Sequence, residues 1–195
     1  MDSTPIIQEA VRILREGGVI LYPTDTVWGI GCDATNEKAV ARVFEIKRRS
    51  EAKSLVLLAC DLDMVAKYIK EIPSIAIDLV EVNDAPMTII YPGAQYLAPN
   101  AVAADGSVGI RIPLAEDNPA GAFCRDLVFR LRKPLVSTSA NISGEPTPAS
   151  FAEISEEIKS AVDYVVPKAF GAGATGRSSQ IIKLGLGGEV EILRP

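Results

Sequence analysis

"KPLVSTSANISGEPTP", residues 133–148, carries an apolar run of strand type directly into a dense group of polar side chains. Four hydroxyls and one amide lie within the seven residues from Ser137 to Ser143. One interpretation is a strand-to-helix turn in which serine, threonine and asparagine side chains cap the main chain. A single cap does not require four hydroxyls, so the composition favours a ligand-binding floor at the end of a strand.

Helical and strand patterns alternate on both sides of this stretch. Helical spacing and capping residues predict helices over residues 5–16, 37–49, 62–72, 74–82, 118–132 and 148–160. Apolar runs predict strands over residues 19–23, 54–59, 87–92, 108–113, 134–139, 163–166, 180–184 and 190–194. Buried strands separated by helices predict an α/β fold, formed as a single domain over residues 1–195. The closely spaced late strands predict a mixed parallel and antiparallel sheet with flanking helices.

The composition is that of an ordinary globular protein. The 195 residues are 48% hydrophobic and 23% charged, which speaks against disorder. No apolar run approaches the roughly 18 residues of a membrane span, and the acidic, amphipathic N-terminus does not resemble a signal peptide. We therefore expect a cytoplasmic protein without a membrane partner. The net charge of −5 argues against a generally basic nucleic-acid binder.

Two features of the composition limit the chemistry. The chain contains no histidine, which excludes Ser-His-Asp and Cys-His catalysis and any histidine-ligated metal. Its three cysteines are far apart and match no metal-binding spacing, so we expect neither a disulfide framework nor a protein-bound metal.

The segment "YPTDTVWGIGCDA", residues 22–34, follows the first predicted strand. Thr24 and Thr26 can present hydroxyls at the carboxyl end of that strand, where open α/β sheets bind ligands. Gly29 and Gly31 permit a close approach of the main chain. The alternative is a glycine-rich turn capped by Asp25, and the segment alone does not decide between the two.

A basic cluster ends the second predicted helix in "IKRRSEAKS", residues 46–54. It contains Lys47, Arg48, Arg49 and Lys53. Cations at this end of a helix complement the helix dipole, which is the simpler explanation. The functional alternative is a phosphate clamp, because arginine forks and lysine point charges suit a triphosphate.

Two further polar features occur late in the chain. Arg111 lies within the apolar strand "VGIRIP", where a buried guanidinium needs an anionic partner. That partner could be an internal carboxylate or a bound one. Ser178, Ser179 and Arg194 follow the glycine-rich "GAGATGR", which lacks the Lys-Ser/Thr pair of a phosphate loop.

Taken in order, these segments resemble the YrdC-like family of threonylcarbamoyl-adenylate synthases. The resemblance runs from "GGVILYPTDTVWGIG" through "IKRR" and "STSANISGEPTP" to "ILRP". The family's lysine-x-arginine motif corresponds to Lys47 and Arg49, and its serine-x-asparagine motif to Ser139 and Asn141. The family fold implies a twisted α/β sheet with a large concave face lined by positive charge.

The resemblance also implies a reaction. Threonine takes up bicarbonate or CO₂ as a carbamate, whose oxygen attacks the α-phosphate of ATP to give threonylcarbamoyl-AMP and pyrophosphate. ATP acts with Mg²⁺, which is held mainly by substrate oxygens and water. Partner proteins then transfer the threonylcarbamoyl group to tRNA. The alternative is a non-catalytic protein that binds tRNA or double-stranded RNA, with binding that weakens steeply as salt rises.

Site residues carry over position by position from the family. The clamp implies Lys47 and Arg49 as catalytic residues. The nucleotide-contacting positions are Arg49, Lys53, Ser107, Asn141 and Arg194. The threonine-contacting positions are Thr26, Arg111, Ser139 and Ser179. We further predict that the hydroxyls of residues 137–139 and the Arg111 side chain line one cavity.

The chain departs from the family at several positions. Trp28 stands where a tyrosine is usual, Leu58 replaces a histidine that often contacts threonine, and Ala149 replaces a serine or threonine near the nucleotide. None of these changes removes the lysine and arginine clamp.

Overall fold

The architecture of the computed structural model, which describes residues 2–50 and 55–195, is built on one mixed sheet. The strand order is β7-β1-β2-β6-β3-β5-β4-β8-β9 among the described residues. The strands are β1 (Ile20–Tyr22), β2 (Gly29–Gly31), β3 (Val56–Leu58), β4 (Met87–Tyr91), β5 (Val108–Arg111), β6 (Leu135–Ser139), β7 (Tyr164–Val165), β8 (Gln180–Leu184) and β9 (Val190–Arg194). The pairs β1–β7, β3–β5 and β4–β8 are parallel, whereas the other neighbours are antiparallel. The predicted α/β fold with a mixed sheet is therefore confirmed.

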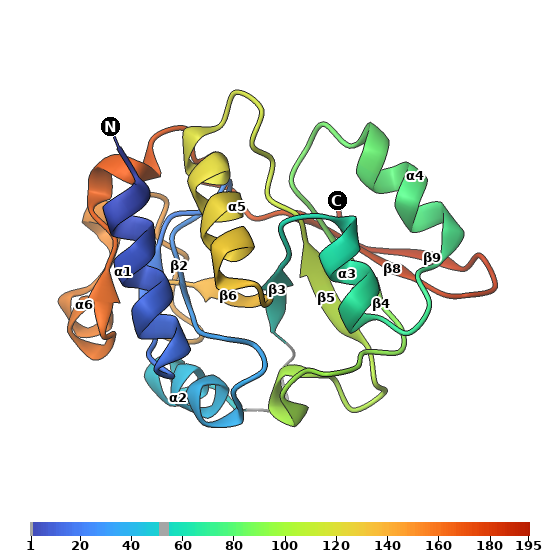
Figure 1. The fold of residues 1–195 in the computed structure, drawn as a ribbon, viewed down its shortest axis with the longest axis horizontal. Helices are drawn as coiled ribbons and strands as arrows, with labels where there is room; N and C mark the ends of the chain where they lie inside the picture. Colours follow the sequence, from blue (N-terminus) through green and yellow to red (C-terminus); the bar gives the residue numbers. More distant parts are fainter. Residues whose placement is uncertain (1, 51–54) are drawn as a thin grey trace.

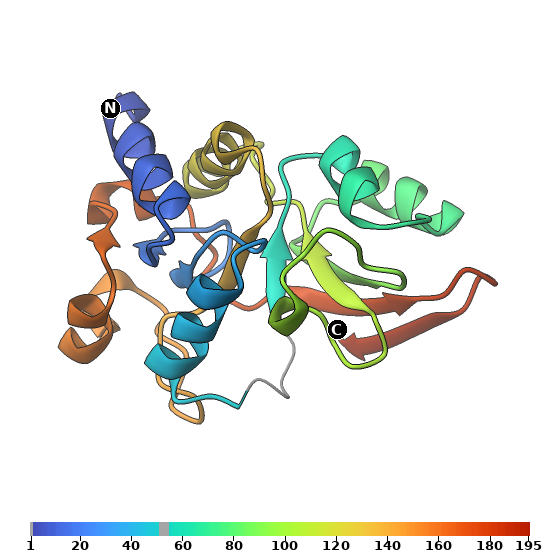
Figure 2. The same ribbon diagram turned by 60° about the horizontal axis from the view of Figure 1, so that its bottom comes forward.

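Several of the helices cover one face of this sheet. The α-helices are α1 (Thr4–Arg15), α2 (Glu37–Lys47), α3 (Leu62–Tyr68), α4 (Ser74–Val82), α5 (Pro119–Leu131) and α6 (Glu156–Ala161). Short 3₁₀ turns are η1 (Pro99–Ala101), η2 (Phe151–Glu153) and η3 (Lys168–Gly171). Figures 1 and 2 show α1, α5, α3 and α4 side by side on the same face. Within the described part of the chain, no helix is both long and apolar enough to span a bilayer.

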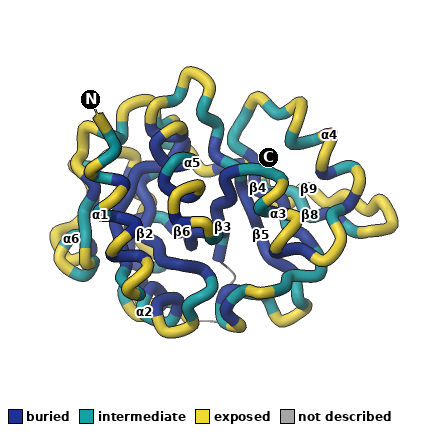
Figure 3. Tube along the Cα trace, in the orientation of Figure 1, coloured by how far each residue is buried: buried dark blue, intermediate teal, exposed yellow. Residues whose placement is uncertain are grey.

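The core lies between the sheet and these helices. The inner strands of the sheet are buried along most of their length, whereas β9 at one edge is exposed throughout (Figure 3). Asparagine and aspartate caps fix the starts of three helices: Asn36 accepts from the Ala39 amide, Asp61 from the Met64 amide and Asn118 from the Gly121 amide. The open face of the sheet is left free for a site.

Four elements differ from the sequence prediction. Helix α2 ends at Lys47 rather than at residue 49, because Arg48 adopts a left-handed conformation. Helix α3 ends at Tyr68 rather than at residue 72, because the chain turns away there: the Lys70 amide donates to the Gly93 oxygen, and the Tyr68 oxygen accepts from the Gln95 amide. The helix predicted over 148–160 is divided into η2 and α6, because Ser155 caps a new start at the Ile158 amide. Strand β2 was not predicted.

The glycines of β2 explain why it exists. A Cβ on Gly31 would lie 1.7 Å from the carbonyl oxygen of Val136, so only glycine lets this strand approach β6. The segment is therefore an antiparallel strand between β1 and β6 rather than only a glycine-rich turn. Through this pairing, the Thr24–Thr26 loop that precedes β2 is held close to the end of β6.

Candidate functional site

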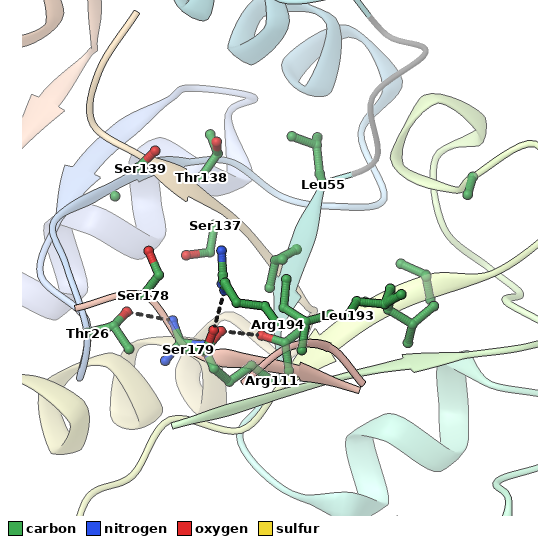
Figure 4. Close-up of a pocket in the computed structure, with 18 of the residues that line it drawn as sticks. Thr26, Leu55, Arg111, Ser137, Thr138, Ser139, Ser178, Ser179, Leu193 and Arg194 are labelled. Atoms are coloured by element: carbon green, nitrogen blue, oxygen red, sulfur yellow. Dashed lines mark hydrogen bonds between the residues drawn. The ribbon is translucent and has the colours of Figure 1, made fainter. Parts of the chain in front are cut away.

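A cavity of about 700 Å³ opens on the face of the sheet away from α3, α4 and α5. Side-chain alternation along β5 shows the two faces: Gly109 and Arg111 line this cavity, whereas Ile110 lines a groove bordered by residues of α4 and α5. The ends of β2, β6, β5 and β4 supply its floor, and β8 and β9 its far wall. Figure 4 shows the side chains that point into this space.

The hydroxyls of the opening stretch belong to this floor. Ser137, Thr138 and Ser139 form the end of β6, and all three line the cavity together with Arg111 (Figure 4). The prediction that these hydroxyls and Arg111 share one cavity is confirmed. The polar run is the last part of a strand, and it turns only after Ser139.

The four positions assigned to threonine lie around the same cavity. Thr26, Arg111, Ser139 and Ser179 all line the cavity. Arg111 Nη2 donates to Thr26 Oγ1 at 3.2 Å (Figure 4). The Ser179 hydroxyl forms a hydrogen bond with Thr88 Oγ1 at 2.8 Å. The Thr26 hydroxyl is thus bonded directly to the guanidinium, whereas the Ser179 hydroxyl is held by the neighbouring strand β4.

The anionic partner of Arg111 within the protein is Asp25. Arg111 Nη1 forms a buried ion pair with Asp25, so the internal carboxylate is present while the guanidinium still borders the cavity. Asp25 is consequently not a simple turn cap. The glycine-rich "GAGATG" segment packs on the same loop, because the Thr175 and Gly176 amides donate to the main-chain oxygens of Asp25 and Thr26.

Three of the nucleotide positions line the same cavity: Arg49, Ser107 and Arg194. Arg194 Nε donates to the Ser179 main-chain oxygen at 2.7 Å, which joins β9 to the threonine positions. Ser107 donates its hydroxyl to Asp105 at 2.6 Å, and this hydrogen bond, with Lys183 nearby, lowers the pKa of Asp105 to about 2. Lys53 falls outside the described residues.

Lys47 and Asn141 stand behind the lining rather than in it. Lys47 Nζ donates to the main-chain oxygens of Ser139 and Asn141, and the Ser143 amide donates to the Lys47 oxygen at 2.8 Å. Burial, followed by the positive charge of Arg49, lowers the pKa of Lys47 from 10.5 to about 8. The side-chain Nδ2 of Asn141 closes the turn by donating to the main-chain oxygens of Ile142 and Glu145. The buried Oδ1 of Asn141 has no hydrogen-bond partner among the described residues.

The residues of the basic cluster therefore point in different directions. Arg48 adopts a left-handed conformation with φ of 50° and reaches outward to an exposed ion pair with Glu157 on α6. This reversal of the chain directs Arg49 toward the cavity. Arg48 thus lies at the exposed helix end, as in the helix-cap interpretation, whereas Arg49 borders the cavity. The phosphate clamp stays a prediction.

Other cavity residues were not singled out from the sequence. Thr88 and Lys183 line the wall, and period-two alternation in "MTIIYP" and "QIIKL" is the signal that could have placed them. Asp105 is the one carboxylate among the described lining residues, and no group of three or more potential metal ligands forms within residues 2–50 and 55–195. Leu58 lies in the core and not in the described lining.

The Sua5/YciO/YrdC family model, described as "Telomere recombination", matches residues 12–195. The chain belongs to the Sua5/YciO/YrdC family. A threonylcarbamoyl-AMP synthase of Xanthomonas euvesicatoria is 34% identical over 192 residues, which cover 94% of this chain and 100% of the relative. One from Pseudomonas aeruginosa is 31% identical over 175 residues, 88% of this chain and 89% of the relative.

Solved structures of the family share the fold. P. abyssi Sua5 in complex with L-threonine has a TM-score of 0.81 and 28% identity, covering 91% of this chain and 50% of that protein. The chain thus spans about half the length of that Sua5. E. coli YciO has a TM-score of 0.77 at 23% identity, over 97% of this chain and 88% of that one.

Proposed function

We propose that this Sua5/YciO/YrdC chain is an L-threonylcarbamoyladenylate synthase. It would convert L-threonine, bicarbonate or CO₂ and ATP into threonylcarbamoyl-AMP and pyrophosphate. The observation that carries the proposal is the shared cavity, which brings Arg111 and the threonine hydroxyl positions together with Arg49 and Arg194. The names of the curated relatives and the L-threonine complex of P. abyssi Sua5 support the same activity.

The threonine half of the cavity suits an amino-acid carboxylate. Arg111 supplies a positive charge that is buried apart from its cavity edge, and Thr26 lies within hydrogen-bond distance of it. Ser139 and Ser179 offer hydroxyls that donate or accept without adding charge. This combination holds a small polar molecule in one orientation.

The other half suits a nucleotide phosphate chain. Arg49 and Arg194 border the cavity from α2's end and from β9, and arginine binds phosphate oxygens through two parallel donors. ATP would enter as its Mg²⁺ complex, with most metal ligands supplied by phosphates and water. The Oδ1 of Asn141 is buried behind this half and has no hydrogen-bond partner among the described residues.

The chemistry requires no histidine. The carbamate oxygen of carboxylated threonine is already a nucleophile, and it forms a bond to the α-phosphorus as the bond to the pyrophosphate oxygen breaks. The protein's part is to align the two substrates and to stabilise charge that develops on the leaving pyrophosphate. Lys47 contributes by fixing the turn that carries Ser139 and Asn141.

The product implies a place in tRNA modification. Threonylcarbamoyl-AMP is an activated mixed anhydride, so separate transferase proteins would take its threonylcarbamoyl group to the adenosine of tRNA. We place this activity in the cytoplasm, where tRNA, ATP and free threonine occur together. Direct RNA binding is the weaker candidate because the chain carries a net charge of −5.

The decisive assay measures pyrophosphate release from ATP with threonine and bicarbonate. We expect release that depends on threonine, and a loss in kcat/KM on the order of 100-fold in Arg49→Ala, since one preorganised charge is removed. Arg48→Ala is the matched control, because the Arg48 guanidinium forms an exposed ion pair with Glu157 and does not line the described cavity. Release without threonine, or equal activity in both variants, would refute the proposal.

A further inference from the structure

Asp25 lies between two cavity residues but is turned away from the cavity. Thr24 and Thr26 line the cavity, whereas Asp25 is completely buried. Its carboxylate accepts from Arg111 Nη1 through one oxygen and from the Leu114 amide at 3.0 Å through the other. The side chain therefore approaches Arg111 from the protein side, opposite any bound ligand.

The N-terminal end of α5 holds Asp25 in this position. The Asn118 side chain caps α5 through the Gly121 amide and donates its Nδ2 to the Asp25 main-chain oxygen at 3.3 Å. A Cβ on Gly121 would lie 1.7 Å from the Leu114 oxygen and 3.1 Å from the Asp25 Cβ, so glycine permits this close packing. The positive end of the helix also favours a carboxylate at this place.

This arrangement fixes how Arg111 faces the cavity. A guanidinium is planar and presents its donors in a fixed fork. Asp25 engages Nη1, and Thr26 Oγ1 accepts from Nη2, so rotation of the fork would break both contacts. The two acceptors are consecutive residues of one loop.

Fold stability alone is a poor explanation for the pair. Burying two opposite charges costs desolvation that their attraction repays only in favourable geometry, and apolar replacements are frequently as stable. This pair sits at a cavity wall, and one of its members borders the cavity. The location points to a role in ligand binding.

We propose that Asp25 is a positioning residue, which orients the Arg111 guanidinium toward the carboxylate of the amino-acid substrate. The inference rests on the proposed function for the identity of that substrate. Asp25 does not touch the substrate and acts through Arg111. It therefore affects the binding of threonine and not that of ATP.

Asp25→Asn tests this role, with Asp33→Asn as the matched control. Asp33 is also buried, pairs with Lys133 at 2.8 Å and accepts from the Thr35 amide, but it lies outside the described cavity lining. We expect Asp25→Asn to raise the KM for threonine at least 10-fold and to leave the KM for ATP within about 2-fold. Equal effects on both KM values, no effect, or the same effect in Asp33→Asn would overturn the proposal.

A double-variant comparison covers the case in which Asp25→Asn does not fold. Arg111→Gln with Asp25→Asn leaves neither charge unpaired, so the double variant is measurable where the single one is not. If Asp25 acts only through Arg111, the threonine KM of the double variant equals that of Arg111→Gln alone. A further increase would contradict the inference.

A crystal structure of Asp25→Asn gives a result that does not depend on catalysis. We expect the Arg111 fork in Asp25→Asn to leave Thr26 Oγ1, and an unchanged fork would overturn the proposal. Failure of the proposed function gives a different result, namely a wild-type protein without threonine-dependent pyrophosphate release.

Discussion

The Lys47 ammonium group donates hydrogen bonds to the main-chain oxygens of Ser139 and Asn141, at 2.5 and 2.8 Å. The lysine of one sequence motif thus fixes the turn of the other, although 92 residues separate Lys47 from Ser139. The two motifs form one structural unit behind the cavity. Substitutions at Lys47 are therefore expected to affect stability as well as activity.

Replacement of Lys47 by methionine should lower the free energy of unfolding by about 1–3 kcal/mol, because two buried carbonyls lose their donor. Activity should fall with it, since Ser139 and Asn141 lose their support. Urea denaturation and the pyrophosphate assay measure the two effects. Arg48→Met, at an exposed ion pair, is the control. An Lys47→Met protein as stable as wild type would show that the ammonium does not hold the turn.

The same lysine predicts a pH dependence of stability. The pKa of Lys47 is about 8 in the folded protein, against the ordinary lysine value of 10.5 that applies in the unfolded chain. Between these two pH values the unfolded chain therefore binds more protons than the folded protein. Stability due to Lys47 therefore rises with pH across this window, by up to about 3 kcal/mol. The difference between wild type and Lys47→Met in urea denaturation should grow from pH 7.5 to 9.5. A constant or shrinking difference would contradict the assignment.

Thr88 supports Ser179 from the neighbouring strand, and its hydroxyl is expected to matter for threonine. Thr88→Val keeps the shape but removes the hydrogen bond to Ser179 Oγ. We expect the KM for threonine to rise about 3- to 10-fold, the range that one lost hydrogen bond produces. Thr35→Val removes a hydroxyl that donates to Asp33, and both residues lie outside the described cavity lining. This variant should leave the KM for threonine unchanged. An equal KM for threonine in the two variants would show that the Thr88 hydroxyl does not contribute to threonine binding.

The close approach of β2 to β6 makes Gly31 sensitive to any side chain. Gly31→Ala places a Cβ 1.7 Å from the Val136 oxygen and should destabilise the protein by about 3 kcal/mol or more. Gly29→Ala meets the Thr138 oxygen only at 3.2 Å, so its cost should be clearly smaller. Thermal unfolding of the two variants decides this order. The reverse order would mean that the strands are not joined as described.

Much of the fold could be predicted from the sequence. The α/β class and mixed sheet follow from buried apolar runs and from local caps such as Asn36 and Asn118, which act within one turn. Strand β2 could not be predicted, because three residues rich in glycine acquire strand geometry only through pairing with β1 and β6. The short end of α3 also depends on a distant partner, the segment around Gly93.

The site divides in the same way. The family resemblance led to the prediction that the hydroxyls after Val136 and the guanidinium of Arg111 line one cavity, and they do. The different directions taken by Lys47, Arg48 and Arg49 could not be read from the sequence, because they depend on the left-handed conformation of Arg48. The pairing of Arg111 with Asp25 likewise requires two segments 86 residues apart.

The most direct test is a crystal structure of the protein with L-threonine and a non-hydrolysable ATP analogue. The account predicts that both occupy the one cavity, with the threonine carboxylate at Arg111 and Thr26 and the phosphates at Arg49 and Arg194. Binding of either ligand elsewhere, or phosphates placed on Arg111, would contradict it.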